Sequence, residues 1–163
     1  MEPEIRRAGP EDADTVWAML KPVFRAGDTY LIDPDISRKD ALAYWMGASH
    51  GVYLAESDGT VLGTYYLRRN QGGGGSHVCN CGYITAAAAR GRGVARAMLT
   101  HSLDTAKAEG FRAMQYNCVV ATNTRAVSTW DRAGFQTVGR LPGAFHHPHE
   151  GYVDALVMWK DLT

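Results

Sequence analysis

Hydrophobic and polar residues follow two different spacings along this chain. Runs with apolar, β-branched or aromatic residues at strand-like spacing alternate with segments whose apolar residues recur at i, i+3 and i+4, as in a helix. The strand-like segments are 4–8, 51–69 (two strands joined by the turn pair Asp58-Gly59), 76–85, 111–120, 135–140 and 151–160. The helix-like segments are one opened by Pro10 and carrying Val16, Met19, Leu20 and Val23, one at 38–47 after Ser37, one at about 92–109 before Gly110, and one at 122–133 before Gly134.

The element order is therefore β-α-α-β-β-β-α-β-α-β-β, with helices interrupting a mixed sheet. This order predicts an α/β or α+β protein and argues against an all-helical bundle. No repeat, charge block or linker divides the chain, so we predict a single domain over residues 1–163. A domain of this length buries a substantial core.

The composition is that of a globular protein without net charge, with 17 basic and 17 acidic residues. A chain without net charge is not expected to bind nucleic acid through overall electrostatic attraction. No apolar run reaches membrane-spanning length and the first residues lack the apolar stretch of a signal peptide, so we expect a cytoplasmic protein without membrane contact. Cys79, Cys81 and Cys118 are then reduced thiols, and the C-x-C spacing of the first two does not fit a zinc site.

The segment 88–99, AARGRGVARAML, places Gly91 and Gly93 between arginines at the start of a helix. A helix N-terminus offers unpaired N–H groups and a positive dipole, which suit phosphate oxygens. The alternative is a flexible turn whose arginines are merely solvated. Two other phosphate-binding motifs do not fit, because G-x-G-x-x-G has Arg96 at its sixth position and no Gly-Lys-Ser/Thr is present.

The remaining pattern, Arg90-x-x-Gly93-x-Ala95, resembles the acyl-CoA signature of the GCN5-related N-acetyltransferases (GNAT). Asn123, Ala126, Gly134-Phe135 and Val138-Gly139 look like that family's second motif, and the element order matches from the first strand to the last. The resemblance implies a mostly antiparallel sheet splayed in the middle, flanked by about four helices. It also implies an enzyme that takes acetyl-CoA as co-substrate and needs no metal.

Three segments, 70–83, 110–127 and 141–159, are similar to the branch of that family that contains the fungal azetidine-2-carboxylate N-acetyltransferases. This likeness implies a small amino-acid-like acceptor with a primary or secondary amine. It also implies that the asparagines at 80, 117 and 123 carry substrate binding and catalysis. From the residues alone, Asn80 and Asn117 equally fit strand asparagines that satisfy buried backbone groups, and Asn123 fits a helix cap.

The resemblance further implies direct attack of a neutral amine on the thioester, through a tetrahedral oxyanion. Backbone atoms near Ile84 and Thr85 are expected to pair with the pantetheine arm, as an added strand does. Asn123 is expected to contact the same arm or the reacting centre. The pyrophosphate is expected at Arg90, Gly91, Arg92, Gly93, Val94 and Ala95.

The chain departs from the family pattern at its acid and base. Trp130 stands where many members place the tyrosine that protonates the leaving thiolate, and 76–85 carries no carboxylate. The base is left open between His77 and a water held by Asn80, and a site that favours the neutral amine by desolvation would need neither.

Residues around the expected pocket also allow more than one interpretation. The histidine-rich segment 146–150 is expected to rim the pocket rather than bind metal, because its spacing lacks a helical H-x-x-x-H arrangement. Tyr30, Tyr44 and Trp45 fit either the pocket or the core. The alternatives to a small-molecule enzyme are an enzyme that acetylates a protein or peptide and a non-catalytic acyl-CoA sensor. We expect the protein to be a monomer or a homodimer.

Overall fold

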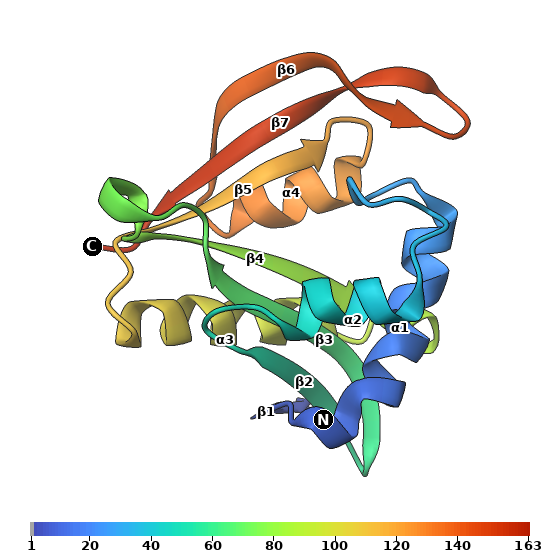
Figure 1. Ribbon diagram of the computed structural model, residues 1–163. Helices are drawn as coiled ribbons and strands as arrows, with labels where there is room; N and C mark the ends of the chain where they lie inside the picture. Colours follow the sequence, from blue (N-terminus) through green and yellow to red (C-terminus); the bar gives the residue numbers. More distant parts are fainter. Residues whose placement is uncertain (1) are drawn as a thin grey trace.

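The computed structural model describes residues 2–163, and in that range the chain forms one seven-stranded sheet with helices on both faces (Figure 1). The strand order is β1-β2-β3-β4-β5-β7-β6, and every neighbouring pair is antiparallel except β4 and β5. The predicted mixed, mostly antiparallel sheet is confirmed. The strands are β1 (Glu4–Arg7), β2 (Val52–Ser57), β3 (Thr60–Arg69), β4 (Val78–Thr85), β5 (Ala113–Val120), β6 (Gln136–His147) and β7 (Gly151–Asp161).

Four α-helices accompany the sheet in this range, and two of them begin at capping side chains that the sequence identifies. The Ser37 hydroxyl accepts a hydrogen bond from the Asp40 N–H at 3.1 Å, and the Asn123 side chain accepts one from the Ala126 N–H at 3.3 Å. The helices are α1 (Ala13–Ala26, after a 3-10 turn at Pro10–Asp12), α2 (Arg38–Met46), α3 (Val94–Ala108) and α4 (Thr124–Arg132).

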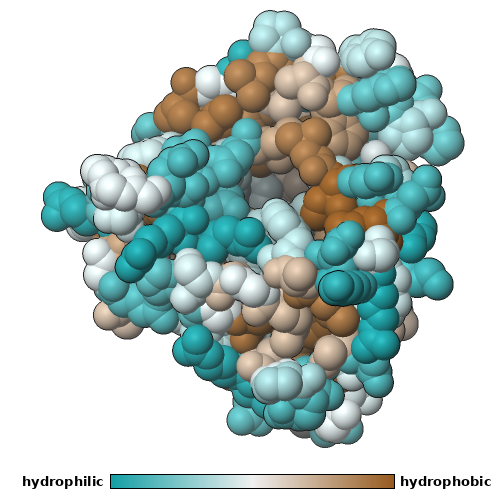
Figure 2. Space-filling model, viewed as in Figure 1, coloured by the Kyte–Doolittle hydropathy of each residue, from teal (hydrophilic) through white to brown (hydrophobic). Residues whose placement is uncertain are grey.

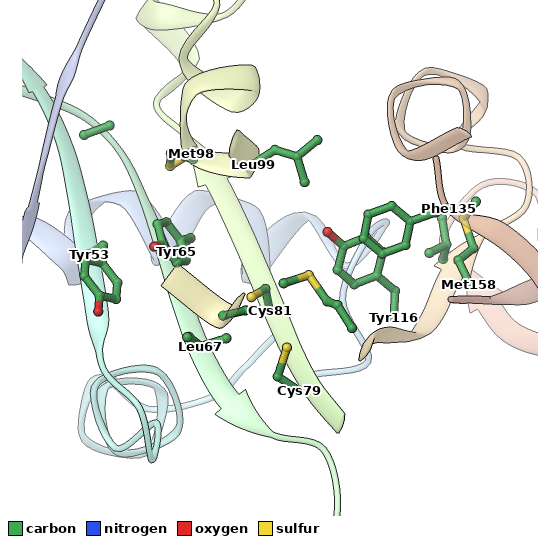
Figure 3. Packing of buried hydrophobic residues seen from close by; sticks show 14 of the residues in the cluster. Tyr53, Tyr65, Leu67, Cys79, Cys81, Met98, Leu99, Tyr116, Phe135 and Met158 are labelled. Carbon is green, nitrogen blue, oxygen red and sulfur yellow. The ribbon is translucent and has the colours of Figure 1, made fainter. Parts of the chain in front are cut away.

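Alternating side chains divide the buried residues into two cores, one on each face of the sheet. Leu54, Tyr66 and Ile84 face the side covered by α1 and α2. Cys79 and Cys81 face the side covered by α3, together with Tyr53, Tyr65, Met98, Tyr116 and Phe135. Figure 3 shows this second core, with both cysteines on β4 and the ring of Tyr116 stacked on that of Phe135 at 4.4 Å.

The sheet forks between β4 and β5. These two parallel strands pair at Val78 with Ala113 and at Cys79 with Met114, and then diverge. Beyond this point one edge of β4 has no neighbouring strand, so main-chain groups and side chains near the sheet centre become accessible.

Two element boundaries differ from the sequence expectation. Helix α3 begins at Val94 rather than near residue 92, because Gly91 and Gly93 adopt left-handed φ angles of 79° and 80°. Strand β6 extends to His147, so that His146 and His147 lie in a strand paired with β7 and not in a loop. No helix formed by residues 2–163 is long and apolar enough to cross a membrane.

Candidate active site

A cleft of about 460 Å³ opens where β4 and β5 diverge. Figure 2 shows that the face seen in Figure 1 is hollowed near its centre, with hydrophilic side chains on one side and hydrophobic ones on the other. Its walls come from the end of α1, the α1–α2 loop, α2, β3, β4, β5 and α4. The lining residues are Val23, Thr29, Tyr30, Leu31, Ile32, Tyr44, Tyr66, Asn80, Cys81, Gly82, Tyr83, Ile84, Thr85, Arg90, Tyr116, Asn117, Cys118, Val119, Val120, Asn123, Ala126 and Trp130.

The charge of this cleft is one-sided. Arg90 is its charged lining residue, and no aspartate, glutamate or histidine of the described chain lines it. The cleft therefore favours anionic groups and offers no side chain with the usual pKa of a general base. His77 is exposed and lies outside the lining, so it is not positioned as the base that the sequence left open.

The free edge of β4 presents main-chain groups to the cleft. The Val78 carbonyl accepts a hydrogen bond from the N–H of Asn70, the residue after β3, at 2.9 Å. The Ala86 N–H donates to the Leu62 carbonyl on β3 at 2.8 Å. Because antiparallel hydrogen bonds alternate along a strand, the main-chain groups of Tyr83 and Thr85 point away from β3. The Tyr83 carbonyl indeed accepts a hydrogen bond from the Tyr30 hydroxyl, at 2.9 Å.

Ile84 has the opposite orientation. It pairs with Thr64 on β3, and its side chain is buried among the residues below α1 and α2. Of the two β4 residues expected to hold a pantetheine arm, Thr85 thus offers main-chain groups to the cleft and Ile84 offers part of its wall.

The turn before α3 carries the predicted phosphate-binding residues. A Cβ at Gly91 or Gly93 would meet nothing within 4 Å, so glycine is required there by the positive φ and not by crowding. Gly93 is the N-cap of α3, and the N–H groups of Val94 and Ala95 bond to no other main-chain group of residues 2–163. Arg90, Arg92 and Ala95 are exposed beside them. The turn is therefore an exposed helix N-terminus with free donors.

Asn80 lies at the fork itself. Its Nδ2 donates to the Gln115 carbonyl on β5 at 2.8 Å, immediately beyond the last paired residues of β4 and β5. Its Oδ1 accepts from the Tyr66 hydroxyl at 3.1 Å. The side chain both satisfies a backbone carbonyl and lines the cleft, and its role toward a substrate stays a prediction.

Asn117 is exposed on β5, where the register with β7 shifts between Tyr116 and Val119. Its Oδ1 accepts from Gln115 Nε2 at 2.9 Å and its Nδ2 donates to Asn70 Oδ1 at 2.6 Å. This chain of amides borders the cleft on the α1–α2 side of the sheet.

Asn123 and Trp130 enter the cleft from α4. Asn123 caps the helix through Oδ1, while its Nδ2 has no partner among the described residues. The Trp130 ring lies 5.2 Å from that of Tyr83 and 4.9 Å from that of Tyr116, centroid to centroid. The three asparagines of the sequence prediction thus all line one cleft.

Two tyrosines under Trp130 form a hydroxyl network that sequence reasoning missed. The hydroxyls of Tyr83 and Tyr116 are 2.9 Å apart, and that of Tyr83 is 2.7 Å from Ser102 Oγ. Burial raises the pKa of both tyrosines well above 10, because the phenolate is poorly solvated there. Both are therefore neutral at physiological pH.

Other residues considered from the sequence have different surroundings. Tyr30 and Tyr44 line the cleft, whereas Trp45 is fully buried and donates to Thr64 Oγ1 at 3.1 Å. The expectation that segment 146–150 rims the pocket is wrong, because none of its residues lines the cleft. The His147 ring instead accepts hydrogen bonds from the N–H groups of His149 and Glu150. In the part of the chain that the structure describes, no group of three or more metal-ligating side chains comes together.

Comparison with known proteins places this geometry in context. Residues 15–135 match the model of the acetyltransferase (GNAT) family. The chain is 35% identical over 104 residues to N-acetyltransferase aca1 of Schizosaccharomyces pombe, an alignment that covers 60% of this chain and 47% of that protein. The chain therefore spans about half the length of this curated relative.

Solved structures share the whole fold. A GCN5-related N-acetyltransferase from Kribbella flavida is 41% identical, with a TM-score of 0.93 over 98% of both chains. The structure of yncA, a putative acetyltransferase from Salmonella typhimurium with its cofactor acetyl-CoA, has a TM-score of 0.87 at 17% identity, over 100% of this chain and 95% of that one. At that identity the second likeness concerns the fold alone.

Proposed function

Since the chain belongs to the acetyltransferase (GNAT) family, we propose that it transfers acetyl from acetyl-CoA to the amine of a small, amino-acid-like acceptor. Family membership confirms the family and enzyme class predicted from the sequence. The observation that carries the specific proposal is the cleft at the β4–β5 fork, which brings the free edge of β4 and three asparagines together.

The residues around the cleft fit acetyl-CoA as co-substrate. Thr85 and Tyr83 offer unpaired main-chain groups for the amides of a pantetheine arm. The N–H groups at the start of α3, with Arg90 and Arg92 beside them, suit a pyrophosphate. Acetyl-CoA, when bound, supplies the acetyl group as a reactive thioester. The acetyl-CoA in the yncA structure supports this assignment through the shared fold.

Charge in the cleft supports a small acceptor that carries an anionic group. A lysine-rich or basic peptide gains from acidic side chains near the site, and none lines this cleft within residues 2–163. An amino acid or imino acid brings its own carboxylate, and no acidic side chain of residues 2–163 lines the cleft to repel it. The sequence likeness to the azetidine-2-carboxylate branch points to the same acceptor class.

The chain's own residues orient the reactants more than they transfer protons. Neutral amides of Asn80, Asn117 and Asn123 hydrogen-bond but do not act as strong bases. The amine must therefore enter in its neutral form or lose its proton to water. Positioning of two bound reactants can supply a large part of the rate of a direct transfer. Trp130, which lines the cleft, packs against the rings of Tyr83 and Tyr116.

A thiol-release assay over amines and imino acids tests the proposal. Turnover is expected with azetidine-2-carboxylate or 4-hydroxyproline and not with basic peptides. Turnover confined to peptides would replace it with protein acetylation. Tight acetyl-CoA binding without any turnover would indicate a sensor, and no binding of acetyl-CoA would refute the assignment of the cleft.

A further inference from the structure

A single chain of hydrogen bonds runs from α2 to β5 across the mouth of the fork. Tyr66 donates to Asn80 Oδ1 at 3.1 Å, and the hydroxyls of Tyr44 and Tyr66 are 3.2 Å apart. A phenol has one hydrogen, so with that of Tyr66 used toward Asn80, the Tyr44 hydroxyl must be the donor of the second bond. Asn80 continues the chain through Nδ2, which donates to the Gln115 carbonyl. Every donor points the same way, and such chains polarise one another.

The position of Tyr66 depends on the absence of a side chain on the next strand. Tyr66 pairs with Gly82 in the β3–β4 register. A Cβ on Gly82 would lie 2.4 Å from Cε2 of the Tyr66 ring, a distance that real contacts do not reach. Glycine at 82 therefore lets the Tyr66 ring lie flat against β4, with its hydroxyl beside Asn80, two residues away on the same face.

A cation without an acidic partner among residues 2–163 lies against this tyrosine pair. The Arg68 guanidinium is 4.4 Å from the Tyr44 ring centroid and 4.1 Å from that of Tyr66. Arg68 is the β3 partner of Asn80, and within residues 2–163 it forms no ion pair. Its Nε is buried without a hydrogen-bond partner. Its Nη2 donates to the Tyr44 carbonyl at 2.6 Å. The guanidinium is therefore held by neutral groups and keeps its net positive charge.

We propose that Tyr66 is a positioning residue, which holds the Asn80 amide with Oδ1 toward the Tyr66 hydroxyl. One hydrogen of Nδ2 then binds the Gln115 carbonyl, and the other is the donor to the acceptor's carboxylate. Tyr44 and Gly82 fix Tyr66, and Arg68 adds a favourable potential for the anion. This inference rests on the proposed function and narrows it. Tyr66, which also lines the cleft, distinguishes an amino acid from the corresponding simple amine by acting through Asn80.

Two acceptors with the same ring test the inference: azetidine-2-carboxylate and azetidine, which lacks the carboxylate. Tyr66→Phe removes the hydroxyl and keeps the ring. We expect kcat/KM for azetidine-2-carboxylate to fall about tenfold, mainly through KM, since a hydrogen bond that orients a donor to a charged group is lost. For azetidine, and for the KM of acetyl-CoA, the expected change is less than about twofold, the level at which a variant counts as unchanged.

The matched control is Tyr53→Phe, which removes a tyrosine hydroxyl on the other face of the sheet, outside the cleft. It is expected to change neither acceptor's kinetics. Gly82→Ala and Arg68→Gln are expected to show the same selective loss as Tyr66→Phe, with melting temperatures measured for each variant. An equal loss for both acceptors, or no loss for either, overturns the inference.

Calorimetric titration of azetidine-2-carboxylate into the CoA-saturated protein separates this inference from the proposed function. If the wild-type protein binds this acceptor without turnover and Tyr66→Phe binds it about tenfold more weakly, the positioning role is supported and catalysis is refuted. Turnover that Tyr66→Phe leaves unchanged refutes the positioning role alone. A wild-type protein that neither binds nor acetylates this acceptor overturns both.

Discussion

The Tyr30 hydroxyl donates a hydrogen bond to the main-chain carbonyl of Tyr83, at 2.9 Å. Tyr30 belongs to the loop between α1 and α2, and Tyr83 to the edge of β4 that no strand covers. The Tyr30 ring packs against Phe24 and Trp45, so this hydrogen bond attaches the α1–α2 loop to the edge of β4. A pantetheine arm that pairs with β4 as an added strand competes for this same carbonyl.

The first prediction concerns this competition. In Tyr30→Phe the Tyr83 carbonyl is free before the cofactor arrives, and we expect acetyl-CoA to bind about fivefold more tightly, which corresponds to a net hydrogen bond of ~1 kcal/mol. Isothermal titration with acetyl-CoA measures the change. Weaker binding would mean that Tyr30 holds the loop in a conformation that acetyl-CoA needs.

The second prediction concerns the turn before α3. Gly93→Val forces a β-branched residue into a left-handed conformation, which costs about 1–2 kcal/mol and displaces the N–H groups at the start of α3. We expect at least about tenfold weaker CoA binding. Gly110→Val is the matched control, since Gly110 has a φ of 88° near the other end of α3 and equally open space for a Cβ. Comparable destabilisation with unchanged CoA affinity is expected for Gly110→Val, and equal affinity losses in both variants would argue against the phosphate site.

The third prediction separates two roles of Asn123. Asn123→Ala removes both the cap, worth ~1 kcal/mol of stability, and the free Nδ2 donor at the cleft. Asn123→Ser keeps a capping oxygen but not the amide. If Nδ2 stabilises the developing oxyanion, turnover falls about 10²-fold in both variants while only the alanine loses stability. Thermal unfolding and steady-state kinetics decide, and normal turnover with a lowered Tm in the alanine variant would mark Asn123 as a cap alone.

The fourth prediction concerns pH. Burial raises the pKa of Tyr83 and Tyr116 well above 10, so both stay protonated, and no carboxylate or histidine of the described chain lines the cleft. Between about pH 6 and 9, kcat/KM is therefore expected to rise about tenfold per pH unit, following deprotonation of the acceptor amine.

Acceptors whose amines have different pKa values test this directly, because the bend in the profile should move with the amine. Trp130→Phe is expected to leave the profile unchanged, since an indole N–H does not titrate in this range. A bend at the same pH for every acceptor would reveal an ionising group of the protein.

Much of the fold follows from short-range patterns. Ser37 caps α2 and Asp58-Gly59 form the hairpin turn, with positive φ angles of 51° and 76°, because both depend on residues adjacent in sequence. The extension of β6 to His147 could not be read in this way. Its partner is β7, and pairing with a neighbouring strand extends a segment whose own composition does not predict a strand.

The candidate site divides similarly. The pattern Arg90-x-x-Gly93-x-Ala95 is local, and the sequence therefore located the turn and its glycines. The role of Asn80 depends on Tyr66, Gln115 and Gly82, which come from three strands. Sequence reasoning missed Tyr66 and Tyr44 as partners of Asn80, because strand tyrosines at these spacings are indistinguishable from ordinary core residues.

The sequence by itself determined the order of the elements, most of their ends and the helix start suited to an anion, because hydrogen bonds and φ preferences between near neighbours set these. Only the tertiary structure decided where β4 and β5 part, that Arg68 has no acidic partner within residues 2–163, and which way the amide of Asn80 is turned. These depend on distances between residues far apart in the chain, and such distances exist only once both faces of the sheet are packed.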